Sequence, residues 1–176
     1  MKSNIKKILA LILMASVLVF SFAACDFPVE NGDQPLAGAD SVKFFAFEER
    51  DDGTYAIVGL SAEGKQEKTL TVPLKYNDAN VSVIASGAFS GGVVEKVIIT
   101  KDTNVRLIEN GAFSDAGELS ALYIYFADAE LILPPADFSG TSDDFTIYVP
   151  DGSYYDVDYF WSAVPGIKDM IQFMGE

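Results

Sequence analysis

Apolar and polar residues alternate in short runs along most of the chain, as they do in β-strands with one buried face. Two such runs, residues 42–47 and 55–60, flank a polar segment that contains Asp52-Gly53. An Asp-Gly pair between two strand-like runs is a turn signal, so the pattern predicts a β-hairpin over residues 41–60. Another alternating run follows at residues 69–74.

A repeat begins after these runs. One short unit recurs as IASGAFSG, IENGAFSD and, more weakly, LPPADFSG (residues 84–91, 108–115 and 133–140). The phenylalanines of the units, at nearly equal spacings, are Phe89, Phe113 and Phe138. Strand-like pairs recur with the same period and a constant phase: Val97 and Ile99, Leu122 and Ile124, Ile147 and Val149. Two independent signals share one period, which predicts a stack of similar units.

Each unit consists of one strand, a turn and a short return segment, and is too small to bury its own apolar face. Stacking would bring the phenylalanines and the inward aliphatic residues into one continuous column. The sequence therefore predicts a β-rich solenoid of the α/β type, with repeats over residues 69–150. The hairpin would cap one end, and residues 151–176 the other.

The C-terminal segment has the residues for a cap. Ser153, with Asp156 three positions later, could begin a short helix that extends through Phe160. Phe160, Trp161 and Ile167 would then cover the last turn. A different interpretation makes the aromatic residues of this segment a sugar-binding cluster: Tyr154, Tyr155, Tyr159 and Trp161. Capping is the more common use of such side chains.

Strand alternation turns the neighbours of the inward pairs outward. The repeat period aligns Ile98 with Tyr123 and Tyr148, and Thr100 with Tyr125. Ile98, Tyr123, Tyr125 and Tyr148 are therefore a candidate ligand face. Two other interpretations remain open: the ladder stabilises the sheet through cross-strand pairs alone, or the N-terminal hairpin covers it.

Residues 1–24 have the pattern of an export signal. Residues 2–7 are basic, and residues 8–22 form an apolar run that is shorter than a membrane-spanning helix needs. The run ends in Phe22-Ala23-Ala24-Cys25, which resembles a bacterial lipobox, with Phe22 where Leu is preferred. Cys25 is then the lipidated first residue of the mature protein. Ordinary cleavage after Ala23 and an uncleaved anchor are the alternatives.

The charge composition of the chain restricts the kinds of molecule that it could bind. Without residues 1–24, which hold three lysines and no acid, nine basic residues face 26 acidic ones, a net charge of −17. Such a surface repels phosphate backbones, so nucleic acid is excluded as a partner. Residues 25–40, rich in Pro, Gly and acids, are typical of a flexible tether between the membrane and the domain.

Catalytic and metal chemistry is restricted as well. The chain has no histidine, and Cys25 is its single cysteine. This excludes His-based triads, Cys–His nucleophiles and the usual zinc sites, and we expect no cofactor. A secreted hydrolase that uses two carboxylates, as glycosidases do, remains as the alternative to a binding protein or a structural spacer.

At the repeat units the sequence resembles the BspA-like leucine-rich repeats of bacterial surface proteins. The resemblance also includes the lead-in YAIVG (residues 55–59) and the closing IYVPDGS (residues 147–153), and it covers roughly Tyr55 to Trp161. Three features depart from the family: Gly92 replaces a frequent Cys, Asp137 replaces Ala, and Pro134-Pro135 is added.

The resemblance implies a curved right-handed leucine-rich-repeat superhelix with a strand sheet on one face. Members of the family are generally regarded as surface proteins that bind other proteins or host and matrix components, and no catalytic residues can be carried over. The expected role is a non-catalytic interaction or adhesion module in the bacterial cell envelope. Its partners would be an extracellular protein or glycan, and the membrane through the lipid on Cys25.

Overall fold

The computed structural model describes residues 39–125, 138, 140–151 and 168–175. The chain divides into two compact units, Met1–Gly32 and Asp33–Glu176, and the described residues all belong to the second. Cys25, most of the predicted tether, most of the third repeat unit and the predicted C-terminal helix lie outside them. Within the described residues, no helix has the length and hydropathy to cross a membrane.

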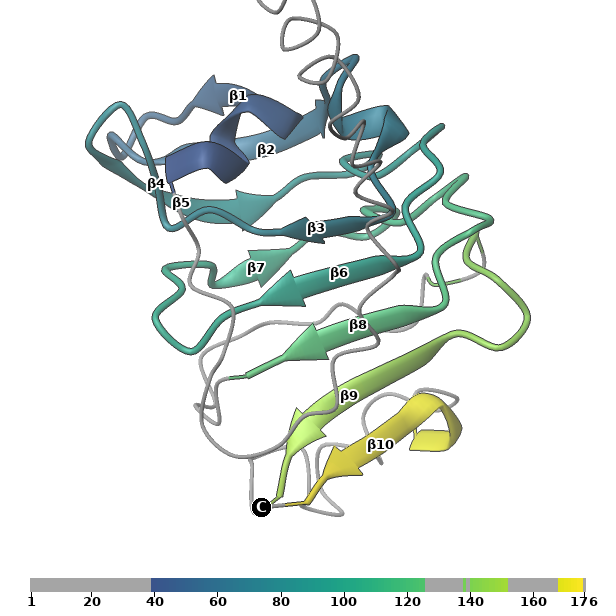
Figure 1. Ribbon diagram of the computed structural model, residues 1–176. Helices are drawn as coiled ribbons and strands as arrows, with labels where there is room; N and C mark the ends of the chain where they lie inside the picture. The colour runs from purple at the N-terminus through teal and green to yellow at the C-terminus, as the bar shows by residue number, and fades with distance from the viewer. Residues whose placement is uncertain (1–38, 126–137, 139, 152–167, 176) are drawn as a thin grey trace, which may run out of the picture. The chain divides into compact units, whose positions relative to one another are not determined.

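Five parallel strands form one face of the second unit, which we call sheet B (Figure 1). They are β3 (Thr69–Thr71), β6 (Lys96–Ile99), β8 (Ala121–Ile124), β9 (Thr146–Pro150) and β10 (Ile171–Met174). Their spatial order follows their order in the chain, with β3 at one edge and β10 at the other. Each strand after β3 is paired with the corresponding strand of the preceding turn.

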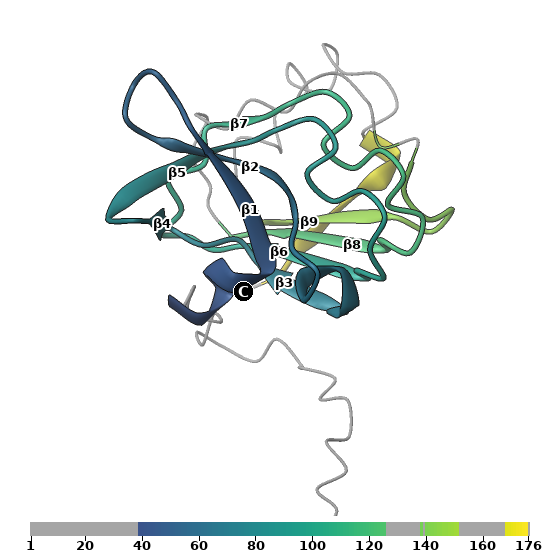
Figure 2. The same ribbon diagram turned by 90° about the horizontal axis from the view of Figure 1, so that it is seen from above.

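A second sheet, sheet A, is formed by the N-terminal hairpin and by segments that return between strands of sheet B (Figure 2). It contains β1 (Phe45–Glu49), β2 (Tyr55–Leu60), β4 (Lys75–Tyr76), β5 (Ala79–Ile84) and β7 (Leu107–Ile108). β2, β5 and β7 pair in parallel, whereas β1–β2 and β4–β5 are antiparallel hairpins. From β2 to β8 the chain therefore passes alternately through the two sheets, which confirms the predicted β-rich solenoid and its N-terminal hairpin.

The space between the sheets is filled by the residues that recur with the period. The inward positions of sheet B are fully buried (0% exposed) in every turn from β3 to β9: Leu70, Val97, Ile99, Leu122, Ile124, Ile147 and Val149. Phe89 stacks on Phe113, with ring centroids 5.1 Å apart, and Phe113 stacks on Phe138 at 5.5 Å. The predicted phenylalanine column is confirmed.

Hydrogen bonds between turns accompany this column. The amides of Gly87, Phe89 and Gly91 donate to the carbonyls of Gly111, Ala112 and Asp115 in the next turn. Gly87 (φ 74°) and Gly111 (φ 77°) occupy equivalent left-handed positions, where glycine carries no Cβ penalty. At Gly140 a Cβ would lie 2.5 Å from the backbone nitrogen of Asp115, so close stacking of the third unit requires glycine there.

The N-terminal end differs from the prediction in two respects. Residues 42–44, predicted as part of a strand, belong to the 3₁₀ helix η2 (Ala39–Phe44), and β1 begins only at Phe45. The predicted run 69–74 is a strand only as far as Thr71. Pro73 cannot donate a backbone hydrogen bond to the ladder, and β4 follows it.

Two elements were not predicted. β4 and β5 form a hairpin whose turn residues, Asn77 (φ 48°) and Asp78 (φ 64°), are both left-handed, as a two-residue turn of this type requires. At the other end of the chain, β10 adds a further strand to sheet B, in register with β9.

The phenylalanine column should dominate stability. Phe113 is 1% exposed and contacts a ring on either side. We expect Phe113→Ala to lower the free energy of unfolding by about 3–5 kcal/mol, measured by chemical denaturation, because it leaves a cavity in the stack. Val93→Ala is the control, since Val93 is 43% exposed. Equal stability of the two variants would contradict the stacked arrangement.

Candidate functional site

The outward positions of sheet B hold the candidate ligand face. Ile98 pairs with Tyr123, and Tyr123 with Tyr148, in the register that the repeat period predicts. Tyr125 follows directly after β8, and its amide donates to the carbonyl of Ile99. We call Ile98, Tyr123, Tyr125 and Tyr148, all half-buried, the aromatic row.

The tyrosine rings of the row stack on one another. The centroids of Tyr123 and Tyr148 are 4.6 Å apart with 9° between the ring planes, and those of Tyr123 and Tyr125 are 6.3 Å apart at 15°. Rings in this arrangement turn their faces toward each other. Because side chains stand roughly perpendicular to a sheet, the row presents ring edges and hydroxyl groups to an approaching partner.

Partial burial also changes the titration of the row. Desolvation raises the pKa of Tyr123, and the neighbouring hydroxyls of Tyr148 and Tyr125 raise it further. Desolvation likewise raises the pKa of Tyr125. Tyr123 and Tyr125 therefore stay neutral through the physiological range, although the chain has a formal net charge of −14.

Thr100 does not lie where the alignment with Tyr125 put it. It follows the last residue of β6, is 3% exposed, and its hydroxyl has no hydrogen-bond partner in the described structure. The strand alternation used for the prediction no longer holds beyond Ile99. The hairpin β1–β2, which could have covered the row, belongs to sheet A.

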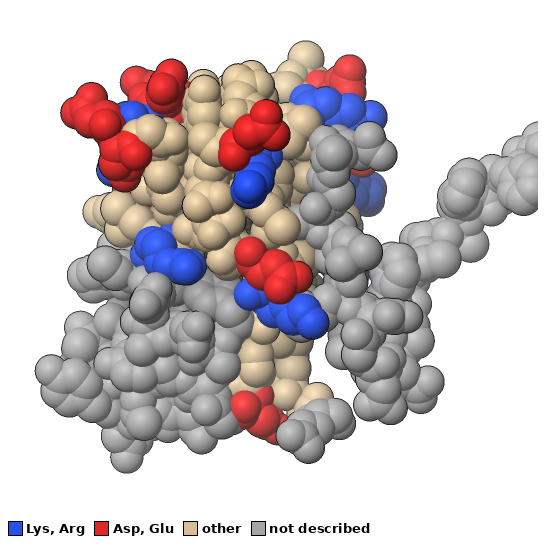
Figure 3. Space-filling model, turned by 90° about the vertical axis from the view of Figure 1, so that its left-hand side faces the viewer, with Lys and Arg blue, Asp and Glu red and all other residues tan. Residues whose placement is uncertain are grey.

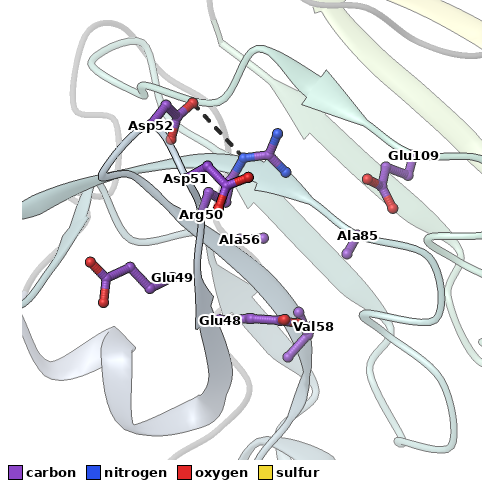
Figure 4. A pocket seen from close by; sticks show the side chains of 9 residues that line it. All are labelled: Glu48, Glu49, Arg50, Asp51, Asp52, Ala56, Val58, Ala85 and Glu109. Atoms are coloured by element: carbon purple, nitrogen blue, oxygen red, sulfur yellow. Dashed lines mark ion pairs between the residues drawn. The ribbon is translucent and has the colours of Figure 1, made fainter.

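Acidic side chains gather at another place, around the hairpin. Figure 3 shows Asp and Glu side chains concentrated near the top of the molecule, the end that contains β1 and β2. There an open pocket of about 500 Å³ is lined by Glu48, Glu49, Arg50, Asp51, Asp52, Ala56, Val58, Ala85 and Glu109 (Figure 4). The repeats alone did not predict this pocket, because the β1–β2 turn contributes much of its lining.

Three of the charged residues that line the pocket, Arg50, Asp52 and Glu109, make local contacts. Asp52 accepts hydrogen bonds from the backbone and side chain of Thr54, at 2.9 and 2.7 Å, and lies 4.0 Å from Arg50. Glu109 accepts a hydrogen bond from the amide of Ser86. The hydrogen bonds from Thr54 lower the pKa of Asp52. A glycosidase acid needs a raised pKa, so Asp52 is unsuited to that role.

The described part of the chain offers no metal centre. Nowhere in it do three or more His, Cys, Asp or Glu side chains lie where they could hold an ion together. Cys25 and the alternative sugar-binding cluster (Tyr154, Tyr155, Tyr159 and Trp161) lie outside the described residues.

A second aromatic cluster escaped the sequence analysis. Phe47 stacks on Tyr76 with centroids 4.1 Å apart, and Tyr55 meets Tyr76 edge to face at 5.0 Å. All three are half-buried and pack against the core, so the cluster closes the N-terminal end of the solenoid. The signal that could have revealed it is Asn77-Asp78, which folds Tyr76 back over the sheet.

Comparisons with known proteins leave the family open. No family model matches the chain, and no curated protein matches it. Among solved structures, the crystal structure of a T. pallidum leucine-rich-repeat protein (TpLRR) is similar at 15% identity and a TM-score of 0.37, over 68% of this chain and 71% of that one. The description of this chain as a solenoid rests on its own strand register and core.

The raised pKa of Tyr123 has a consequence for stability. Above pH about 10, the unfolded chain loses this proton before the folded one does. The contribution of the protonated Tyr123 to the free energy of unfolding is therefore complete below pH about 10. It is lost as the pH rises through the folded-state pKa of Tyr123. We expect Tyr123→Phe to reduce the alkaline loss of stability, measured as the free energy of unfolding against pH, with Tyr55→Phe as the control. An alkaline profile identical to that of the wild type would contradict a desolvated Tyr123.

Proposed function

We propose that the protein is a lipid-anchored module of the bacterial cell envelope that binds another protein through the aromatic row. The observation that carries the proposal is the row itself, in which an isoleucine and two tyrosines are held in register and Tyr125 stacks on Tyr123, all half-buried on a strongly acidic chain. Tyrosine is enriched at the energetic centres of protein interfaces, and apolar surface clusters mark contact sites.

The stacking geometry favours a protein over a glycan as the partner. Sugars commonly pack on exposed aromatic faces, but the faces of Tyr123 and Tyr148 are turned toward each other at 4.6 Å. Ring edges and hydroxyls remain for contact. These groups suit the apolar side chains and backbone polar groups of a protein surface.

The envelope location rests on the sequence. Phe22-Ala23-Ala24-Cys25 follows a basic start and an apolar run, and the acidic, Pro- and Gly-rich residues 26–40 come next. A diacylglyceryl cysteine supplies two acyl chains, which stable anchoring requires. The BspA-like repeat motifs support membership of that family of surface proteins.

Binding through the row can be tested with two double variants. We expect Tyr123→Ala with Tyr148→Ala to weaken binding to a responsive member of a panel of purified extracellular-matrix proteins by about tenfold or more, measured by surface plasmon resonance. Thr71→Ala with Thr146→Ala is the control on the same face. Binding that only a glycan array detects, or that the tyrosine variant retains in full, would contradict the proposal. No binding to the protein panel or to the glycan array would favour a structural spacer.

Anchoring is tested separately. We expect Cys25→Ala to move the protein from the membrane fraction to the periplasm or medium, and to abolish metabolic labelling with a palmitate analogue that marks the wild type. Cell fractionation followed by immunoblotting measures the first effect. Retention of Cys25→Ala in the membrane would instead support an uncleaved anchor.

A further inference from the structure

The two edges of sheet B are built differently. At one edge, η2 contacts β3, which is only three residues long. Pro73 lies two residues beyond the end of β3. The other edge is β10, which among the described strands pairs only with β9 (Figure 1). An edge strand with unpaired backbone groups is a template for the addition of another strand.

β10 lacks the devices that usually protect such an edge. Its residues, Ile-Gln-Phe-Met, include no charge and no proline. By contrast β1, at an edge of sheet A, carries Glu48 and Glu49. Phe173 is 38% exposed although it is in register with Val149, which is 0% exposed. An additional strand beside β10 would cover this ring.

The backbone of β10 determines which residues could bond to that strand. The carbonyl of Met174 accepts a hydrogen bond from the amide of Asp151, at 3.4 Å, so the peptide groups of Met174 face β9. Peptide groups alternate in direction along a strand. Those of Ile171 and Phe173 therefore point away from β9, toward the edge that no described strand occupies.

We propose that two copies of the chain associate tail to tail by antiparallel pairing of their β10 strands, about a two-fold axis at Gln172. Ile171 then lies opposite Phe173 of the second copy, and Gln172 lies opposite its own equivalent. Directly opposite residues share a face of the sheet. The pairing therefore joins the two inner apolar faces and brings the two glutamine amides together on the outer face.

A second copy fits this edge because β10 is self-complementary. Its pattern around Gln172 is apolar, polar, apolar, so rotation about that residue matches like with like, and two-fold dimers are the commonest homo-oligomers. In this register Ile171 and Phe173 form hydrogen-bonded pairs through the peptide groups that point outward. Gln172 forms the closer, non-hydrogen-bonded pair, with Cα atoms about 4.5 Å apart. The association does not depend on the binding role of the aromatic row.

Disulfide capture tests the register in the full-length protein. A Cα separation of about 4.5 Å lies within the range of disulfides. We expect Gln172→Cys to form disulfide-linked dimers under mild oxidation, with a yield at least about tenfold above that of Phe173→Cys, which is not opposite its own equivalent. The wild type, with Cys25 alone, sets the background. Equal yields for the two variants, or a Gln172→Cys yield at background, would overturn the proposal.

A charge introduced at Gln172 tests the contact without a covalent link. Dimerisation of the detergent-solubilised full chain is measured by sedimentation. Gln172→Glu and Gln172→Lys should each weaken it by about tenfold, because like charges then oppose each other across the axis. An equimolar mixture should restore the dimer. Thr69→Glu, on the opposite edge strand and facing Lys96, is the control and should sediment as the wild type does. A monomeric wild type, or a mixture that does not recover, would overturn the proposal.

Discussion

Stacking between turns is the interaction on which the rest of this structure depends. A single turn contributes short strands and a few apolar side chains, and it can bury them only against the turns above and below. The column of Phe89, Phe113 and Phe138 meets this need, with ring centroids 5.1 and 5.5 Å apart. Beyond this column, Phe45 contacts Phe89 and Phe145 contacts Phe138. The column thus extends from the hairpin to the turn before β9.

The same constraint separates structural from functional positions. Inward residues of sheet B must keep their volume and apolar character, because each is enclosed by its equivalents in neighbouring turns. Outward residues are subject only to cross-strand pairing, so they can change with little effect on the fold. The aromatic row occupies such positions, which is why a binding surface can be placed there without disturbing the core.

The repeated parts of the fold were predictable because the stacking imposes a period on the sequence. Phe89 and Phe113, and the pairs Val97/Ile99 and Leu122/Ile124, could be placed from their spacing alone. The register of Ile98, Tyr123 and Tyr148 follows from the same spacing and strand alternation. The binding role of these residues stays a prediction, because a period specifies position and carries no information about a partner.

The parts that the sequence analysis missed are those without a period. η2 replaces the start of the first predicted strand, since residues 42–44 alternate as a strand would but form a 3₁₀ helix instead. The β4–β5 hairpin depends on two left-handed residues within one turn. β10 keeps the phase of β9, at Ile171 and Phe173, but no unit of the GAFS type precedes it.

The central claim is that successive turns of the repeat lie directly on one another. Nuclear Overhauser measurements on protein with isotope-labelled phenylalanine rings test it most directly. The account predicts cross-peaks between the ring protons of Phe89 and Phe113, and between those of Phe113 and Phe138, each pair being in stacking contact. A folded protein in which both cross-peaks are absent would contradict it.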